Sequence, residues 1–179
     1  MTQKKGVIGM NDTLFECTYT DSEALLRESY TKVQFRKKVE LGWALMGFAL
    51  CVFALAFWMA KPVWRLIGCL LIVGGGYLLW QPVGKAKNVM DSILRNNHGT
   101  VPTAKIVVTD RITHYYKLDT SVLLFADLRY VYFLKHSVVL IGEETYVTFD
   151  RNGFTKGSPE EFEAFLKEKY PHVEIFHKA

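Results

Sequence analysis

The chain has 179 residues, with 22 Lys and Arg against 18 Asp and Glu, which allows one ordinary domain and an additional segment. Residues 101–179 hold 10 of the basic and 11 of the acidic residues, so the positive excess lies before them and no nucleic-acid partner is expected. The three cysteines, Cys17, Cys51 and Cys69, have no CxxC spacing, which argues against a zinc site and a disulfide framework.

The first predicted elements precede a long apolar block. Residues 13–20, TLFECTYT, alternate polar and apolar side chains and predict a short strand. Residues 21–38 predict an amphipathic helix with Asp21 or Ser22 as its N-cap. We expect residues 1–39 to form a cytoplasmic segment made of this strand and helix. The basic end of the helix either contacts anionic lipid or only sets the topology of the membrane spans.

The apolar block predicts a transmembrane hairpin over residues 40–83. Residues 41–60, LGWALMGFALCVFALAFWMA, carry no charge and would form a helix of about 30 Å, one hydrocarbon thickness. Residues 63–83 form a second apolar run in which Arg65 is the single charge, in the first turn, where its side chain can reach the headgroups. Pro62 fits the start of the second helix and disfavours helix at the residue before it, as a tight turn requires.

Basic side chains gather at one end of the predicted hairpin, and tryptophans lie near all four span ends. The positive-inside bias then places both termini in the cytoplasm. The predicted membrane-interface residues are Arg36, Lys37, Lys38, Trp43, Trp58, Lys61, Trp64, Arg65, Trp80, Lys85 and Lys87.

Small residues within the two spans predict close approach of the helices. Gly74, Gly75 and Gly76 lie in the second span, and Ala56 and Ala60 are four residues apart in the first. Residues of this size let helix backbones approach, either within the hairpin or against a partner.

After the hairpin, residues 84–100 predict a juxtamembrane helix that ends between Asn97 and Gly99. Short β-branched and aromatic runs separated by turn residues then predict an antiparallel, barrel-like meander. The predicted strands cover 105–110, 111–118, 121–125, 129–136, 137–142 and 145–150. Whether the strand at 13–20 joins this sheet as a seventh strand is left open by the sequence.

The segment SPEEFEAFLKEKY, residues 158–170, predicts a final helix. Ser158 is its capping residue, Pro159 occupies the first turn, and Glu161 completes a capping box. Its apolar stripe is formed by Phe162, Phe165, Leu166 and Tyr170. We expect this stripe to cover the open end or one face of the sheet.

This order of elements resembles the YcxB-like family of bacterial membrane proteins. The likeness is carried by LLFADLRYVYFLKHSVVLIGEETYVTFDRNGF and by TKGSPEEFEAFLKEK. It implies an α+β membrane protein of the bacterial inner membrane with a two-helix transmembrane hairpin, followed over 101–179 by an antiparallel PH-like sheet or barrel capped by a C-terminal helix. The chain has Tyr132 where relatives often carry an acidic residue. The resemblance supplies no enzymatic activity.

No arrangement of residues predicts catalysis, a cofactor or a metal. The histidines show neither HxH nor HExxH spacing. A triad of Ser121, His136 and Asp127 lacks the GxSxG turn that would expose a serine nucleophile. The glycines of VGGGYLLW have no lysine of a phosphate-binding loop.

We therefore expect a non-enzymatic module, anchored in the lipid bilayer, that serves as a binding or regulatory platform for another membrane or cytoplasmic protein or for a second copy. The alternative hypothesis is a membrane self-protection or stress protein, of the bacteriocin-immunity kind, that acts through its hairpin. Replacing the hairpin by unrelated apolar helices would preserve function in the first case and abolish it in the second.

Overall fold

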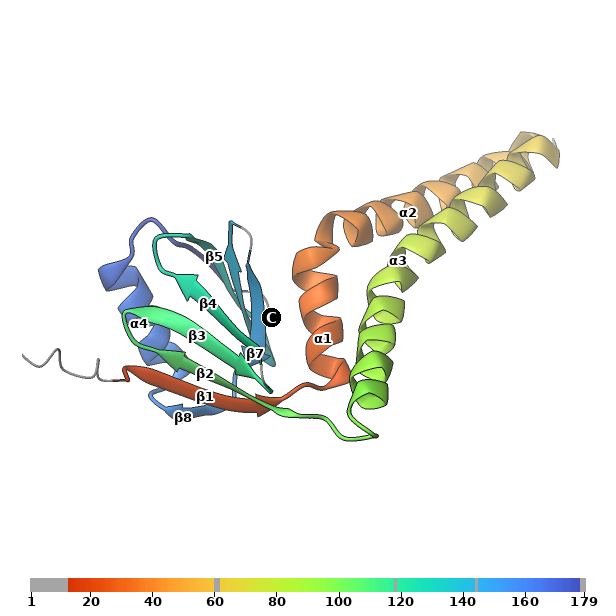
Figure 1. Cartoon of the computed structure of the whole chain (residues 1–179). Helices are drawn as coiled ribbons and strands as arrows, with labels where there is room; N and C mark the ends of the chain where they lie inside the picture. The colour runs from red at the N-terminus through yellow and green to blue at the C-terminus, as the bar shows by residue number, and fades with distance from the viewer. Residues whose placement is uncertain (1–12, 60–61, 118, 144, 178–179) are drawn as a thin grey trace, which may run out of the picture. The chain divides into compact units, whose positions relative to one another are not determined.

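The computed structural model describes residues 13–59, 62–117, 119–143 and 145–177 and divides the chain into two compact units (Figure 1). The helical unit comprises residues 22–100. The strand unit comprises the residues before 22 together with those after 100. The strand unit is therefore assembled from two stretches of chain, whereas the sequence predicted separate segments at 1–39 and 101–179.

The helical unit contains three α-helices and a π-helical turn: α1 (Glu23–Ser29), η1 (Tyr30–Gln34), α2 (Arg36–Met59) and α3 (Pro62–Asn96). The predicted helix over 21–38 is interrupted at Phe35, where φ is −104° and ψ is 13°. The basic run that begins at Arg36 therefore opens α2 instead of closing the first helix. The predicted juxtamembrane helix over 84–100 is the last part of α3, which continues through Pro82.

The ends of the helical unit carry the predicted capping residues. The backbone N–H of Leu25 donates to the side-chain oxygen of Ser22 at 3.2 Å, so Ser22 is the N-cap of α1. After α3, His98 (φ 52°) and Gly99 (φ 84°) adopt left-handed backbone conformations. The N–H of Gly99 donates to the carbonyl of Leu94 at 2.8 Å, which satisfies an open carbonyl at the helix end.

Helices α2 and α3 pack along a seam of small residues. A Cβ added at Gly75 would lie 2.9 Å from the carbonyl oxygen of Gly42, so the two backbones approach as closely as glycine allows. Ala49 and Ala56 on α2 are fully buried. Gly42, Ala49 and Ala56 recur every seven residues, as do the buried Gly68 and Gly75, which is the repeat of helices that pack side by side.

The predicted glycine triplet divides between two environments. Gly75 faces α2, whereas a Cβ at Gly74 or Gly76 would have no described atom within 4 Å. The prediction of close approach is thus confirmed at Gly75 and Ala56. Ala60 lies outside the described residues.

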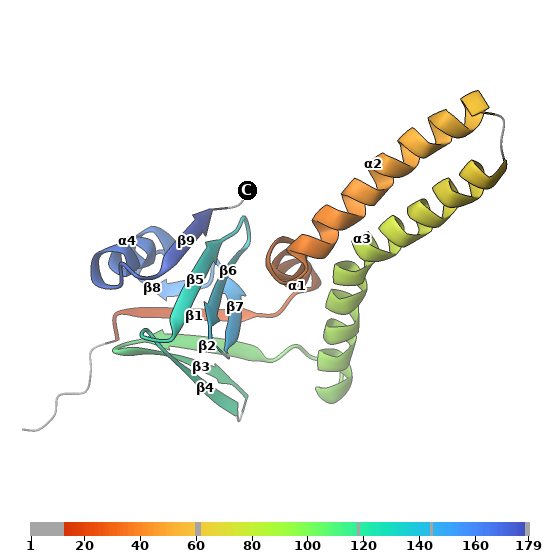
Figure 2. The same cartoon turned by 90° about the horizontal axis from the view of Figure 1, so that it is seen from above.

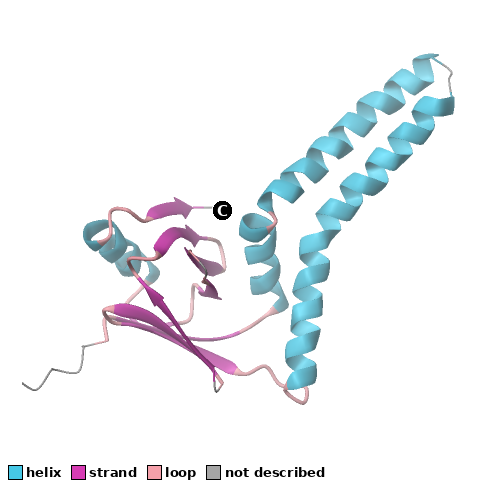
Figure 3. Ribbon diagram, turned by 45° about the horizontal axis from the view of Figure 1, so that its top comes forward, coloured by secondary structure: helices cyan, strands magenta, loops and turns pink. Residues whose placement is uncertain are grey.

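The strand unit has two sheets, visible in Figures 2 and 3. One has the order β4-β3-β2-β1-β8 and the other β7-β6-β5-β9. The strands are β1 (Phe15–Thr20), β2 (Thr103–Val108), β3 (Arg111–Tyr116), β4 (Asp119–Leu124), β5 (Leu128–Phe133), β6 (Ser137–Gly142), β7 (Tyr146–Asp150), β8 (Phe154–Lys156) and β9 (Glu174–His177).

The six strands predicted after the hairpin correspond to β2 through β7. Strands β8 and β9 were not predicted, because three or four residues are too few to show alternation. The prediction of one antiparallel meander is incomplete, since the strands form two sheets and β9 pairs parallel to β5.

Strand β1 is the seventh strand that the sequence left open. It pairs antiparallel with β2 from Phe15↔Val108 to Thr20↔Thr103. Thr20 lies just before the helical unit and Thr103 just after it. Since these two residues are register partners, the chain leaves the sheet and returns to it at the same end of the β1–β2 pair.

Side chains of β1 also bind the second sheet. The Tyr19 hydroxyl donates to the backbone carbonyl of Thr148 at 2.8 Å, and the Cys17 thiol donates to that of Asp150 at 3.5 Å. Both carbonyls belong to β7, the terminal strand of the four-stranded sheet. They are two residues apart and therefore lie on one strand edge. Strand β1 thus joins the sheets at this corner.

Helix α4 (Pro159–Lys169) closes the core of the strand unit, as its apolar stripe predicted. Ser158 caps it by accepting a bond from the N–H of Glu161 at 3.1 Å. Phe162 and Leu166 are buried, and the ring of Phe162 contacts that of Phe15 on β1 at 5.3 Å between centroids. The core therefore depends on β1 as well as on residues after 100.

Replacing residues 21–102 by Asn-Gly is expected to leave a folded strand unit, because Thr20 and Thr103 are register partners and a two-residue turn suits such a hairpin. Cooperative thermal unfolding of the soluble protein would show this. Residues 101–177 alone should aggregate, since β2 loses its neighbour β1 and exposes an open edge, and Phe162 loses Phe15. Equal folding of both proteins would contradict the central role of β1.

Gly75→Ala is expected to destabilise the helical unit by about 1–3 kcal/mol, because its Cβ would overlap the Gly42 carbonyl. Gly74→Ala is the matched control: its Cβ meets open space, and alanine favours helix by up to about 1 kcal/mol. Thermal denaturation in detergent followed by tryptophan fluorescence measures both, since every Trp lies in α2 or α3. Equal midpoints for the two variants would argue against the seam.

Candidate functional site

The predicted basic residues converge at one end of the α2–α3 pair. The Lys38 ammonium donates to the side-chain oxygen of Gln81 on α3 at 3.3 Å and lies 5.1 Å from the centroid of the Phe35 ring. Lys85 and Lys87 are exposed on α3, one to two turns beyond Gln81. Arg36 pairs with Glu40 at 2.7 Å on the surface of α2. The sequence did not indicate Gln81 as a partner of Lys38, because 43 residues separate them.

The four tryptophans mark two levels along the helix pair. Trp43 and Trp58 are 65% and 83% exposed on α2, Trp80 is 63% exposed on α3, and Trp64 is half-buried. Trp43 to Trp58 and Trp64 to Trp80 each span about 22–24 Å of helix, somewhat less than the thickness of a hydrocarbon layer. Indole rings favour positions just inside the headgroups.

At the opposite end of the pair, where α2 ends and α3 begins, Arg65 is the basic side chain among the predicted interface residues that the structure describes. The Arg65 guanidinium lies 6.0 Å from the centroid of the Phe57 ring, on the neighbouring helix. Lys61 lies outside the described residues. The basic side chains are thus concentrated at the opposite end, where Lys37, Lys38, Lys85 and Lys87 lie.

The outward faces of α2 and α3 are covered with large apolar side chains. Leu50, Phe57 and Val73 are 69%, 84% and 70% exposed. The most apolar 18-residue stretch is only 22% buried in α2 and 17% buried in α3. Both helices are long and apolar enough to cross a membrane. The helical unit therefore buries its small residues and exposes its large apolar ones, the reverse of a water-soluble helix pair.

A row of polar groups lies inside the strand unit. Tyr19 Oη is 3.1 Å from His114 Nε2 and donates its proton to the Thr148 carbonyl. His114 must then carry its proton on Nε2 and donate to Tyr19. Burial lowers the pKa of His114, which favours the neutral ring. The sequence did not reveal this row, although His114 and Tyr116 occupy inward positions of β3 beside the buried Ile112.

Two hydroxyls near this row, Tyr116 Oη and Thr148 Oγ1, are buried without a hydrogen-bond partner among the described residues. Asp21 follows β1, and burial raises the pKa of its carboxyl group. Burial and then the charge of Asp21 raise the pKa of Tyr116. The two unpaired hydroxyls lower the stability of this sheet end, because burying polar groups without partners is unfavourable.

This row of polar groups is not the Ser121, His136 and Asp127 triad that the sequence argued against. Ser121 is the register partner of His114, not of His136. The proton of His114 is directed to a phenol, so no carboxylate orients the ring as hydrolytic triads require. Among the described residues no group of three His, Cys, Asp or Glu side chains could hold a metal ion, and the absence of metal and cofactor stays a prediction.

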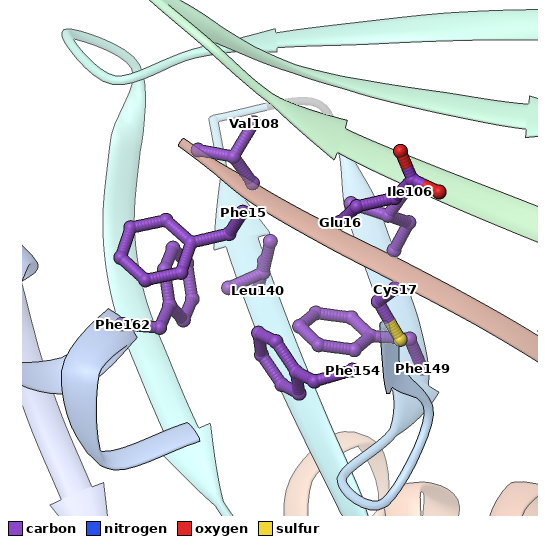
Figure 4. Close-up of a pocket in the computed structure, with 9 residues that line it drawn as sticks. All are labelled: Phe15, Glu16, Cys17, Ile106, Val108, Leu140, Phe149, Phe154 and Phe162. Carbon is purple, nitrogen blue, oxygen red and sulfur yellow. The ribbon is translucent and has the colours of Figure 1, made fainter. Parts of the chain in front are cut away.

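An apolar pocket lies between the two sheets beneath α4 and β8 (Figure 4). It leaves about 10 Å³ for a water-sized sphere, and phenylalanine rings from β1, β7, β8 and α4 surround it. Burial and the nearby Asp150 raise the pKa of the Cys17 thiol in its wall to about 12, so the thiol is unreactive at neutral pH. The pocket is a packing gap too small for a ligand.

Comparison with family models, with curated proteins and with solved structures finds no match for this chain. The resemblance to the YcxB-like family therefore stays a prediction.

His114 is expected to make the strand unit less stable in mild acid. Its pKa in the folded chain lies below the ordinary value of 6.5, so below pH 6.5 the unfolded chain binds a proton that the folded chain resists. Stability then falls as the pH decreases from about 6.5 toward the folded pKa, by up to about 1.4 kcal/mol for each unit of difference.

His114→Phe should reduce this slope between pH 7.5 and 5.5, while losing about 1 kcal/mol of hydrogen bonding at pH 7.5. Both effects are measured as the free energy of unfolding of the strand unit, obtained from hydrogen exchange of the β1 and β3 amides at increasing urea concentration. His136→Phe, at an exposed turn, is the control. An unchanged slope in His114→Phe would show that this imidazole titrates normally.

Proposed function

We propose that the chain is a multi-pass membrane protein of the bacterial inner membrane, resembling the YcxB-like family. Its hairpin holds a PH-like, non-enzymatic module at the cytoplasmic surface, where the module binds a partner protein. The observation that carries the proposal is the inverted polarity of α2 and α3, with glycine and alanine inside and large apolar side chains outside. In water such a surface would aggregate, whereas hydrocarbon solvates it.

The pairing of β1 with β2 supports a hairpin with both ends on one side. The strands flank residues 22–100 and are hydrogen-bonded neighbours. A chain that leaves and returns to one sheet crosses a membrane an even number of times, and α2 and α3 supply two crossings. The basic residues at the end formed by Lys38 and Lys85 favour the cytoplasm for that side.

The strand unit supports the PH-like module. Strands β1 to β7 lie in two sheets, and α4 buries Phe162 and Leu166 in the core of the strand unit, which is compatible with a PH-like module. The module offers strand edges and exposed aromatic side chains, such as those of Tyr115 and Tyr130. Protein segments are recognised through such edges.

Crosslinking and recovery from native membranes tests the proposal with three proteins. These are the full chain, residues 22–100 alone, and a chain in which residues 39–83 are replaced by unrelated apolar spans of equal length. The same partner is expected with the full chain and with the replaced hairpin, and at least tenfold less with residues 22–100. The strand unit must be removed on both sides of the hairpin, because β1 belongs to it.

Recovery of the partner with residues 22–100, together with its loss when the spans are replaced, would contradict the platform role. It would favour the alternative in which the hairpin itself protects the membrane.

A further inference from the structure

Strand β9 forms the parallel pair of the four-stranded sheet. It adds to the edge of β5 in the register Tyr130↔Glu174, Val131↔Ile175, Tyr132↔Phe176 and Phe133↔His177. It follows α4 after residues 170–173. The chain therefore covers the β5 edge, which would otherwise be an open strand edge beside α4, with its own extended segment.

The two faces of β9 meet different surfaces. On the outer face, Phe176 stacks on Tyr132 with ring centroids 4.9 Å apart and planes at 17°, and it lies 6.2 Å from the ring of Tyr130. On the other face, Ile175 lies beside the fully buried Val131 in the register. The β5 edge thus holds an aliphatic residue followed by an aromatic one.

The residue after the aromatic one, His177, lies beside a carboxylate of α4. His177 stacks on Phe133 at 5.6 Å between centroids, and its Nε2 lies 3.1 Å from a carboxylate oxygen of Glu163 on α4. Lys167 also pairs with Glu163, and this pairing, followed by the charge of His177, lowers the pKa of Glu163. A basic or imidazole side chain after the aromatic residue would meet the same carboxylate.

Strand β9 is less buried than β6, the strand on the other side of β5. Glu174 and His177 are exposed and Ile175 and Phe176 only half-buried, whereas β6, on the other side of β5, is buried at five of six positions. Four residues in parallel pairing contribute few hydrogen bonds of the less stable geometry. A short edge strand of this kind opens before the sheet as a whole unfolds.

We propose that the β5 edge is a peptide-binding site that β9 occupies in cis. Its ligand is an extended segment of a partner protein that adds parallel to β5, with an aliphatic residue, an aromatic residue and a basic or imidazole residue in succession. The inference rests on the proposed platform function and specifies its site. Binding exchanges one strand for another, so the β5–β6–β7 sheet remains unchanged while β9 is released.

A labelled synthetic peptide of residues 171–177, PHVEIFH, is the probe for this site. In the full-length protein, the double variant Ile175→Asp/Phe176→Asp removes the two residues that β9 places against β5. This variant is expected to bind the peptide saturably and at least tenfold more tightly than the unmodified chain, measured by fluorescence anisotropy. The same peptide with both residues replaced by Asp should not bind.

The matched control is Val122→Asp/Leu124→Asp, which places the same charges at exposed apolar positions of β4, the edge of the other sheet. Its peptide binding should equal that of the unmodified chain. A chain in which Tyr132→Cys and Phe176→Cys are joined by a disulfide should not bind the peptide. The proposal would be overturned if the peptide bound neither the Ile175→Asp/Phe176→Asp variant nor the unmodified chain while circular dichroism showed an intact sheet.

Hydrogen exchange of the unmodified chain keeps the proposal falsifiable if the variant does not fold. The amides of β9 are expected to exchange at least tenfold faster than those of β6. Equal protection of β9 and β6 would show that β9 is an integral strand and would overturn the site. Both measurements use purified protein, so they report on the β5 edge separately from recovery of a partner out of native membranes, which reports on the platform role.

Discussion

The pairing of β1 with β2 is the constraint on which the rest of the structure depends. The two strands are separated by residues 22–100, yet they are hydrogen-bonded neighbours over their whole length. Helices α2 and α3 must therefore form a hairpin whose ends return to one place. Tyr19 and Cys17 of β1 also bind the edge of β7, so the strand unit is incomplete until the chain has passed through both helices and returned.

The two units follow opposite rules of polarity, as the proposed solvation of the helical unit by hydrocarbon and of the strand unit by water would require. In the strand unit, large side chains such as Phe133, Phe149 and Phe162 are fully buried, as the hydrophobic effect requires in water. On α2 and α3, the buried positions are mostly glycines and alanines, such as Gly42 and Gly75, whereas large side chains such as Phe57 and Leu70 are exposed. In hydrocarbon, apolar side chains would gain nothing from burial, and close backbone packing would provide the stability of the proposed hairpin instead.

Much of the architecture could be predicted from the sequence because the signals were local. The apolar runs around Pro62, the alternation in β2 to β7 and the Ser158 cap each depend on residues close in the chain. The contacts that complete the fold are distant in sequence: the bond between Tyr19 and His114, the contact of Lys38 with Gln81, and the addition of β9 to β5. Four residues of β9 carry no periodicity, and their strand exists because Val131 and Tyr132 offer an edge.

Labelling from one side of the membrane tests the central claim most directly. In a chain with Cys51→Ser and Cys69→Ser, where the remaining Cys17 is buried and unreactive, one cysteine is added at Lys61→Cys in the predicted turn or at Lys117→Cys on the strand unit. Each variant is exposed to a membrane-impermeant maleimide in intact spheroplasts. The hairpin account expects labelling of Lys61→Cys in intact spheroplasts and of Lys117→Cys only after lysis. Labelling of both positions from the same side would contradict a two-span hairpin that returns β2 to β1, and so would labelling that does not change at either position on lysis.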